Sequence, residues 1–239
     1  FQTLQDVQDT IDKTKSLQPD RLAFYSYAHV PWIKGNGQRG FKDEDLPKDD
    51  EKRQLYEEGK KRLAQNGYLE IGMDHFALEN DSMYESFKAG NLHRNFMGYT
   101  ASKTKLMIGL GVSSISDSWY SFAQNEKSIE DYYARLEAKE LPVFKGHLLN
   151  SEDLVIRKHI LNLMCKFTTS WKDEALKFTE LNEIHKSLKE MEVDGLLSFI
   201  SDGITVTEKG KPFVRNICMA FDLRLIRKAP ETKLFSMTI

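Results

Sequence analysis

The chain has 239 residues, of which 40% are hydrophobic and 29% charged, so it can bury the core of one large or two small domains, which excludes disordered and fibrous proteins. Its 34 Lys and Arg nearly balance its 36 Asp and Glu, and a net charge of −2 argues against general nucleic-acid binding, which rests on neutralising phosphates. No apolar run approaches the roughly 20 residues of a membrane span.

The first third of the chain alternates helical and strand patterns. Residues 1–17 carry apolar side chains near helical spacing, and residues 21–27 form an aromatic-rich strand that ends near His29. Residues 32–50 have the glycine and charge content of a loop. A helix then runs from about Asp50 to residue 66, and residues 68–73 form the next strand. This alternation predicts an α/β fold with a parallel sheet and helices outside it.

A long polar stretch, residues 74–104, holds two histidines and an arginine. Ordinary connections are much shorter, so we expect a functional loop here. A short buried strand over residues 105–108 leads into the glycine-containing segment 109–116. A helix over residues 128–138, which Ser128 can cap, follows it.

Helical patterns dominate after Pro142. We expect helices over residues 151–166, 173–178 and 181–191, a hairpin around an Asp-Gly turn within 196–207, and a last helix from 210 towards 227. Helices followed by a hairpin resemble a winged helix, so we place a domain boundary between residues 1–145 and 146–239. Lys and Arg only balance Asp and Glu in the second part, so DNA binding is not expected.

Two predicted strand ends are candidate ligand sites, because parallel sheets and barrels bind ligands at strand ends. Ala28 would let a ligand approach the backbone, and His29 would supply a hydrogen bond or a proton; a structural histidine is the commoner alternative. Gly109 and Gly111 lack the spacing of phosphate-binding fingerprints, and a tight strand exit with room for an adenine-like group is the better interpretation.

The long polar stretch offers an anion site. Arg94 can bind a carboxylate through two hydrogen bonds, and with His75 and His93 it would suit an anionic substrate, with Arg39 and Lys42 upstream. A solvated charged surface explains the pattern equally well. The neighbours Asp74 and His75 are not a metal site by themselves.

The other reactive residues give no signature. Cys165 and Cys218 read as free packing thiols of a cytoplasmic protein, and neither they nor a serine stand in a nucleophile motif. Residue chemistry therefore assigns neither a catalytic residue nor a metal ligand.

Five longer strings are more specific than any short motif. They are residues 27–31 (YAHVP), 71–77 (IGMDHFA), 92–100 (LHRNFMGYT), 109–116 (GLGVSSIS) and 215–222 (RNICMAFD). In this order, over the whole chain, they resemble the oxygen-independent coproporphyrinogen III oxidases of bacterial haem synthesis. Haem chaperones of the same superfamily resemble the chain less well, because the second and third strings are of the oxidase type.

The resemblance implies a radical S-adenosylmethionine enzyme with the later part of a partial (βα) barrel and a mainly helical, winged-helix-like C-terminal domain. In that family a C-x-x-x-C-x-x-C motif holds a 4Fe-4S cluster that cleaves S-adenosylmethionine, and the resulting radical takes a hydrogen from a propionate of coproporphyrinogen III. Loss of carbon dioxide and one electron leaves a vinyl group, and two such events give protoporphyrinogen IX. The electron donor and acceptor are not identified.

The chain departs from the family in lacking the three-cysteine motif, which the family places upstream of all five strings. Because the chain also begins at Phe1 instead of Met, we expect it to be the C-terminal half of such an enzyme. Alone it would be inactive, unable to bind the cluster, and prone to self-association through exposed strand edges.

By position, Ala28 and Ile115 match family residues that contact S-adenosylmethionine. His29, His93 and Arg94 are suggested by their chemistry for propionate or proton handling. Two other functions stay open at this point: a radical S-adenosylmethionine haem chaperone, and a non-catalytic winged-helix interaction module. Neither nucleic acid nor a membrane is expected as a partner.

Overall fold

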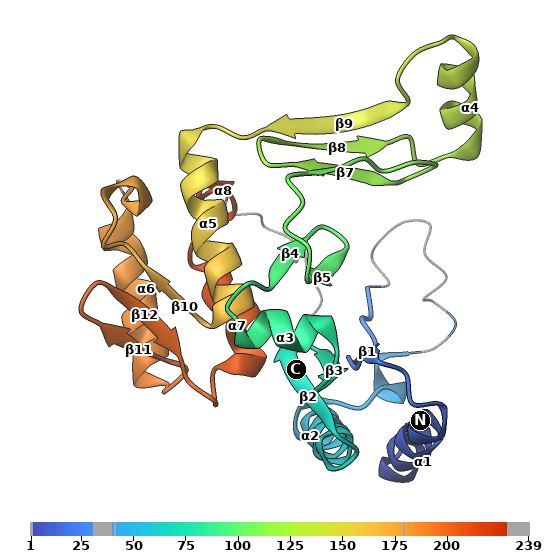
Figure 1. Cartoon of the computed structure of the whole chain (residues 1–239), viewed down its shortest axis with the longest axis vertical. Coiled ribbons are helices and arrows are strands. Elements are labelled where there is room, and N and C mark those ends of the chain that lie inside the picture. The colour runs from blue at the N-terminus through green and yellow to red at the C-terminus, as the bar shows by residue number, and fades with distance from the viewer. Residues whose placement is uncertain (1, 31–39, 41, 179, 229–239) are drawn as a thin grey trace.

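The computed structural model describes residues 2–30, 40, 42–178 and 180–228, and they form a mixed assembly of helices and small sheets (Figure 1). The helices are α1 (Leu4–Leu17), α2 (Asp49–Gln65), α3 (Ser82–Lys88), α4 (Ile129–Glu137), α5 (Ser151–Lys166), α6 (Leu181–Val193), α7 (Val214–Met219) and α8 (Leu223–Lys228). Short 3-10 helices lie at Asp43–Asp45, Glu174–Leu176 and Lys211–Phe213. Residues 32–39 and 41 of the predicted loop 32–50 lie outside the described residues, and Arg39 is one of them.

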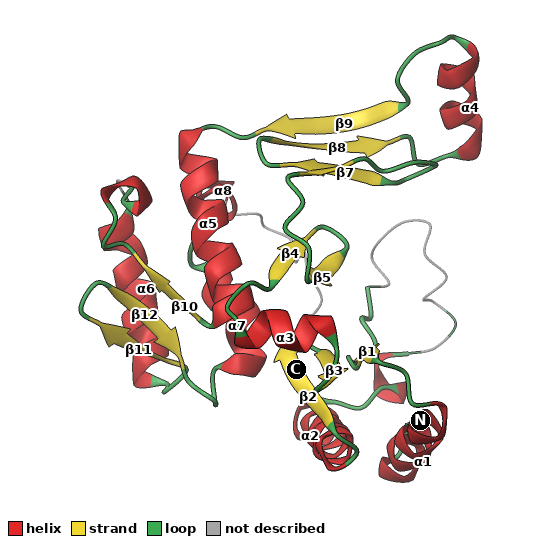
Figure 2. Cartoon of the chain, in the orientation of Figure 1, coloured by secondary structure: helices red, strands yellow, loops and turns green. Residues whose placement is uncertain are grey.

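The described strands form four separate sheets, in the orders β1-β3-β2, β4-β5, β6-β7-β8-β9 and β10-β12-β11 (Figure 2). Their bounds are β1 (Arg21–Ala23), β2 (Tyr68–Gly72), β3 (His75–Leu78), β4 (His93–Asn95), β5 (Gly98–Thr100), β6 (Leu106–Met107), β7 (Ile115–Ser118), β8 (Ser121–Asn125), β9 (Val143–Leu148), β10 (Thr168–Ser170), β11 (Leu197–Ile200) and β12 (Gly203–Val206). No sheet in the described part of the chain closes into a barrel.

Parallel pairing was the wrong prediction for these strands, since every described pair is antiparallel. The cause lies in the turn after β2. Asp74 takes a left-handed backbone conformation, with φ of +59°, and the chain reverses there so that Gly72 pairs with His75. A hairpin therefore stands where a crossover was expected.

The prediction of a loop over residues 74–104 is also wrong, because most of this segment forms regular secondary structure. It contains β3, α3 and the β4-β5 hairpin, and Asp81 caps α3 by accepting a hydrogen bond from the Met83 amide at 2.7 Å. Strands β7, β8 and β9 were also missed. Their polar residues hide the alternation that marks a strand, because no side of this sheet is deeply buried.

The helical predictions fared better. Helix α5 has the predicted bounds and Asn150 as its cap, and α4 follows the predicted Ser128 cap. The β11-β12 hairpin forms where predicted, but its turn residues are Ser201 and Asp202, because Gly203 already pairs with Ile200. The helix expected over 173–178 shrinks to a single 3-10 turn, and the last helix breaks into a 3-10 turn, α7 and α8.

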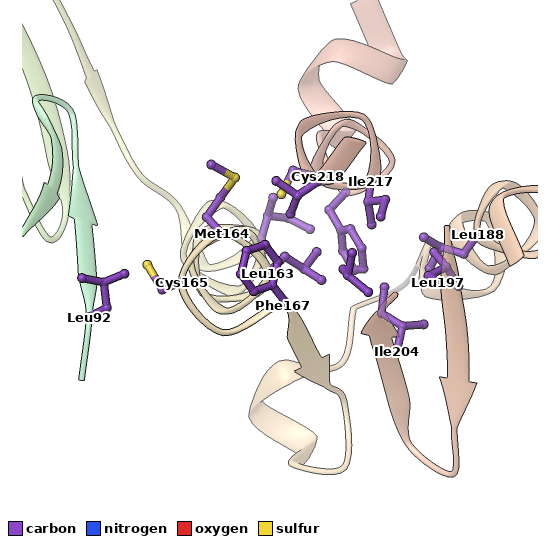
Figure 3. Close-up of a cluster of buried hydrophobic side chains, with 14 of the residues drawn as sticks. Leu92, Leu163, Met164, Cys165, Phe167, Leu188, Leu197, Ile204, Ile217 and Cys218 are labelled. Atoms are coloured by element: carbon purple, nitrogen blue, oxygen red, sulfur yellow. The ribbon is translucent and has the colours of Figure 1, made fainter. Parts of the chain in front are cut away.

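Helix α5 is the centre of the main core (Figure 3). Leu163 and Phe167 face the hairpin residues Leu197 and Ile204 on one side, while Cys165 points towards Leu92 on the other. The same core includes Ile71 and Tyr99, so its buried residues come from both sides of position 145. A smaller core joins α1, α2, β2 and β3 through Val7, Ile11, Leu55, Leu63, Tyr68 and Phe76.

The four-stranded sheet projects from this body and carries α4 at its far end (Figure 1). Arg157 of α5 ties it down, since its guanidinium donates to the Asp117 carboxylate at 2.8 Å and to the Ser118 carbonyl at 2.9 Å. The same group lies against the rings of Trp119 and Phe122. At the start of α5, Asp153 accepts two hydrogen bonds from Arg224, which fastens α8.

None of the described helices is both long enough and apolar enough to span a membrane.

Histidine burial should make the fold sensitive to mild acid. His159 is fully buried between the Thr169 hydroxyl and the Leu176 carbonyl, both at 2.8 Å, and burial lowers its pKa from the ordinary 6.5. Burial lowers the pKa of His93 and His185 in the same direction. The unfolded chain therefore binds these protons more readily, so stability is full above the ordinary pKa and is lost as the pH falls through it.

We predict that the free energy of unfolding, measured with urea, falls between about pH 7.5 and about pH 5.5, by at most about 1.4 kcal/mol per pH unit for each histidine. In His159→Gln the slope should be shallower. A wild-type free energy that stays level over this range would contradict the account.

Candidate functional site

Five polar or aromatic side chains from four different segments gather where the β2-β3 and β4-β5 hairpins meet. We refer to Tyr56, Asp74, His75, Arg94 and Tyr99 as the Arg94 cluster. Tyr56 comes from α2, Asp74 lies in the turn between β2 and β3, and His75 is the first residue of β3. Arg94 and Tyr99 are directly paired across β4 and β5. The cluster therefore depends on long-range packing, not on a sequence motif.

Tyr99 fixes the position of the cluster. Its hydroxyl accepts a hydrogen bond from the Met73 amide at 3.2 Å and donates one to the Met164 carbonyl at 2.8 Å, which ties the turn after β2 to the end of α5. Burial raises its pKa, so the hydroxyl stays neutral. Gly72 leaves room for the ring, because a Cβ there would lie 2.4 Å from Tyr99 Cζ.

His75 is held in one tautomer. Its Nδ1 lies 2.8 Å from the Met73 carbonyl, which can only accept, so Nδ1 carries a hydrogen, and Nε2 accepts in the neutral ring and donates in the imidazolium. The ring meets that of Tyr99 edge-on at a centroid distance of 5.0 Å. Gly98 lies beside Nε2, where an added Cβ would be 3.7 Å away.

Arg94 lies with its guanidinium carbon 4.8 Å from the centroid of the Tyr99 ring. One of its terminal nitrogens, Nη1, is buried and has no hydrogen-bond partner among the residues that the structure describes. A buried charged donor without a partner is costly, so this nitrogen can receive an anion.

Asp74 supplies the negative charge of the cluster. Burial raises the pKa of its carboxyl, while a hydrogen bond from the Tyr56 hydroxyl and the charges of His75 and Arg94 act in the opposite direction. Burial also raises the pKa of Tyr56. The Asp74 carbonyl accepts the Phe24 amide at 2.8 Å, which joins the strained turn to the segment after β1.

The structure separates His93 from Arg94. They are neighbours on β4 and so point to opposite faces of the strand. Burial lowers the pKa of His93, with the Arg157 charge adding to the effect, which places it beside the Arg157 and Asp117 pair and away from the cluster. His75, in contrast, joins Arg94 as the sequence suggested.

The two residues matched to cofactor contacts lie on different elements. Ala28 is exposed in the segment after β1, followed by the half-buried His29, whose ring is 5.9 Å from that of Tyr27. Ile115 begins β7 in the four-stranded sheet, and Gly109 packs so closely that a Cβ there would lie 2.7 Å from the Ile115 carbonyl oxygen.

The chain around Ile115 is held by a side chain that sequence reasoning missed. The amide of Asn125 donates to the Gly111 carbonyl at 2.9 Å and to the Ser114 hydroxyl at 3.1 Å, and it also reaches the Gly109 carbonyl at 3.3 Å. Tyr99 and Arg157 were missed as well. In the sequence, only Gly72, which precedes Met73, Asp74 and His75, could have indicated that another side chain packs closely against the backbone there.

The residues present do not fit an iron-sulfur cluster. The chain has two cysteines, and Cys165 and Cys218 are both buried, on α5 and α7. Burial raises their pKa to about 11 and about 12, whereas a ligand must be a thiolate. In the described ranges no group of three or more His, Cys, Asp or Glu side chains could hold a metal ion.

No protein-family model matches the chain. Curated relatives named oxygen-independent coproporphyrinogen III oxidase match it throughout. The protein from Escherichia coli K12 is 38% identical over 233 residues, covering 95% of this chain and 51% of the relative. The protein from Synechocystis is 35% identical over 247 residues, with 100% and 53% covered. The protein from Thermostichus vulcanus is 35% identical over 238 residues, with 97% and 73% covered.

The fold comparison agrees. The solved structure of coproporphyrinogen III oxidase from E. coli, described as a radical SAM enzyme, superposes with a TM-score of 0.85 at 36% identity, covering 94% of this chain and 52% of that one. The chain thus spans about half the length of the first two relatives and matches the C-terminal half.

The Tyr99 hydroxyl gives a prediction for stability. Tyr99→Phe keeps the ring but leaves the Met73 amide and the Met164 carbonyl without their partner, so the free energy of unfolding should fall by about 1 to 3 kcal/mol. Urea unfolding measures the change. Tyr120→Phe, at an exposed tyrosine, is the control and should change it by less than about 0.5 kcal/mol. Equal effects of the two substitutions would show that the hydrogen bonds of the Tyr99 hydroxyl do not stabilise the fold.

Proposed function

Because the chain belongs to the oxygen-independent coproporphyrinogen III oxidases, we propose that it supplies the C-terminal half of such an enzyme. The reaction is the oxidative decarboxylation of two propionates of coproporphyrinogen III to vinyl groups, which gives protoporphyrinogen IX. The observation that carries the proposal is the continuous match to a relative of this name, which covers all of the chain at 35% identity.

Within the proposal, S-adenosylmethionine supplies the radical that starts the reaction, and Ala28 and Ile115 contact it. Ala28 is small and exposed, and Gly109 packs directly against the Ile115 backbone beside β7. The 4Fe-4S cluster is bound by residues outside this chain, since the buried Cys165 and Cys218 do not fit it. The chain alone is therefore inactive.

The finer fold assignments belong to the same proposal. We take residues 1–145 as the later part of a partial radical SAM-type barrel and residues 146–239 as a winged-helix-like domain in a cytoplasmic protein. The TM-score of 0.85 over 94% of the chain supports the first, and the β10-β12-β11 sheet next to α5 and α6 supports the second. Exposed apolar side chains beside β6, such as Ile108 and Leu110, make self-association of the isolated chain the expected behaviour.

His29 and His93 complete the proposed site as hydrogen-bonding or proton-handling groups. His93 acts from the opposite face of β4 to Arg94, so the two residues would contact different parts of a substrate. The electron donor and acceptor are separate partners of the complete enzyme.

A half-for-half exchange tests the proposed function. This chain replaces the C-terminal half of the E. coli relative, and the chimera is assayed without oxygen with coproporphyrinogen III, S-adenosylmethionine and a reductant. We expect protoporphyrinogen IX to form. The chain alone, and the E. coli N-terminal half alone, should form none.

The chimera also contains its own control for folding, because its cluster absorbance and its cleavage of S-adenosylmethionine are measured separately. A chimera that holds the cluster and cleaves S-adenosylmethionine, yet leaves coproporphyrinogen III unchanged, would overturn the proposed function. Haem binding without turnover would point to a chaperone instead.

A substitution at Ala28 tests the cofactor contact. Ala28→Leu in the chimera should raise the KM for S-adenosylmethionine roughly tenfold, because the larger side chain fills the space that the ligand needs. Ala64→Leu, at an exposed position of α2, is the matched control and should leave that KM unchanged. A normal KM in Ala28→Leu would remove Ala28 from the site.

A further inference from the structure

We propose that Arg94 and His75 form a carboxylate-binding pair, which, if the proposed function holds, takes one propionate of the porphyrinogen substrate. The pair stands on contacts that the resemblance and the comparisons do not assign. Arg94 is the charged partner of the carboxylate, and His75, whose Nε2 donates to a carboxylate when both ring nitrogens carry a hydrogen, is the second hydrogen-bonding group.

Among the described residues, Arg94 differs from most other arginines in having no carboxylate partner. Most described arginines already have carboxylate partners: Arg21 with Asp81, Arg53 with Glu57, Arg62 with Glu58, Arg135 with Glu126, Arg157 with Asp117, Arg224 with Asp153 and Arg227 with Glu152. Arg94 forms no ion pair within the described residues, and its Nη1 is buried without a hydrogen-bond partner. An arginine in this state accepts a carboxylate at little further desolvation cost.

The guanidinium of Arg94 is preorganised by the Tyr99 ring. The guanidinium of Arg94 lies 4.8 Å from the centroid of the Tyr99 ring, and that ring is fixed by its hydroxyl between the Met73 amide and the Met164 carbonyl. Because its platform cannot move freely, the guanidinium loses less conformational freedom when a ligand arrives.

His75 contacts the same Tyr99 ring as Arg94. Arg94 and His75 both act electrostatically on the carboxyl of Asp74, and both lie against the Tyr99 ring, with the Arg94 guanidinium carbon 4.8 Å and the His75 ring centroid 5.0 Å from its centroid. The bond from Nδ1 to the Met73 carbonyl turns Nε2 away from that carbonyl. Nε2 lies beside Gly98, whose missing Cβ leaves its surroundings open.

The charges of the cluster favour a carboxylate as the bound anion. Asp74 is a poor occupant, because the Tyr56 hydroxyl already lies beside its carboxyl and acts to lower the pKa of that group. With Asp74 nearby, the cluster holds one arginine, one histidine and one acid, so its net positive charge is small. Such a site suits a singly charged carboxylate better than a phosphate, which binds where several cations converge.

The test measures binding and needs no turnover. Coproporphyrin III, the oxidised and fluorescent form with the same carboxylates, is titrated into the chimera described above without S-adenosylmethionine or reductant. Arg94→Gln should weaken binding roughly tenfold, the loss expected for a charge-assisted hydrogen bond. Coproporphyrin tetramethyl ester, which has no carboxylates, should bind the wild type and Arg94→Gln equally.

Arg53→Gln is the matched control for the arginine. Arg53 also lies near an aromatic ring, that of Phe213 at 5.9 Å, and also has a buried Nη1 without a partner, but Glu57 already neutralises it. Its substitution should leave the affinity for coproporphyrin III unchanged.

His75 provides a second arm that does not depend on Arg94 variants folding. His75→Asn can keep the hydrogen bond to the Met73 carbonyl but lacks Nε2, so it should weaken binding several-fold. His75→Gln places an amide near the position of Nε2 and should recover part of the affinity.

Unchanged affinity for coproporphyrin III in both folded Arg94→Gln and His75→Asn would overturn the inference, as would equal binding of the acid and the ester by the wild type. Turnover separates this from the proposed function. A chimera that decarboxylates its substrate with no dependence on Arg94 refutes the pair alone, and one that binds through Arg94 but never decarboxylates refutes the function alone.

Discussion

The arrangement of the molecule depends on the buried hydroxyl of Tyr99, which joins the turn after β2 to the last turn of α5. One bond orders the Met73 amide beside the strained Asp74, and the other attaches β5 to the helix at the centre of the main core. In an interior of low dielectric such a bridge is strong, and its loss would leave two backbone groups without partners. The N-terminal hairpins and the C-terminal helices are in this way parts of one structure.

The same bridge explains how a site is made from segments that are far apart in the sequence. Arg94 and His75 both lie against the Tyr99 ring, Gly72 leaves room for that ring, and Gly98 places no side chain beside His75 Nε2. Asp74, held by Tyr56 from α2, balances their charge. A second joint, Arg157 with Asp117, holds the sheet that carries Ile115 against α5. The proposed anion site and the sheet that carries Ile115 are therefore both anchored to this helix.

The sequence predicted what depends on local physics. Helix α5, the Ser128 cap of α4 and the existence of the β11-β12 hairpin follow from periodicity, capping and turn-forming residues, and the family follows from the five strings. It could not predict the β2-β3 pairing, because the positive φ of Asp74 is a conformation that glycine normally takes. Nor could it separate His93 from Arg94 without knowing that residues 93–95 form a strand, or find Tyr99, whose partners are set by tertiary contacts.

The Tyr99 bridge holds the Arg94 cluster in the geometry that binds a carboxylate. The most direct measurement is the affinity of the Tyr99→Phe chimera for coproporphyrin III, compared with the tetramethyl ester. The hydroxyl is occupied by Met73 and Met164, so no ligand contact is removed. We predict weaker binding of the acid and unchanged binding of the ester. Unchanged affinity for both porphyrins, in a variant that has lost the stability of the bridge, would contradict the claim.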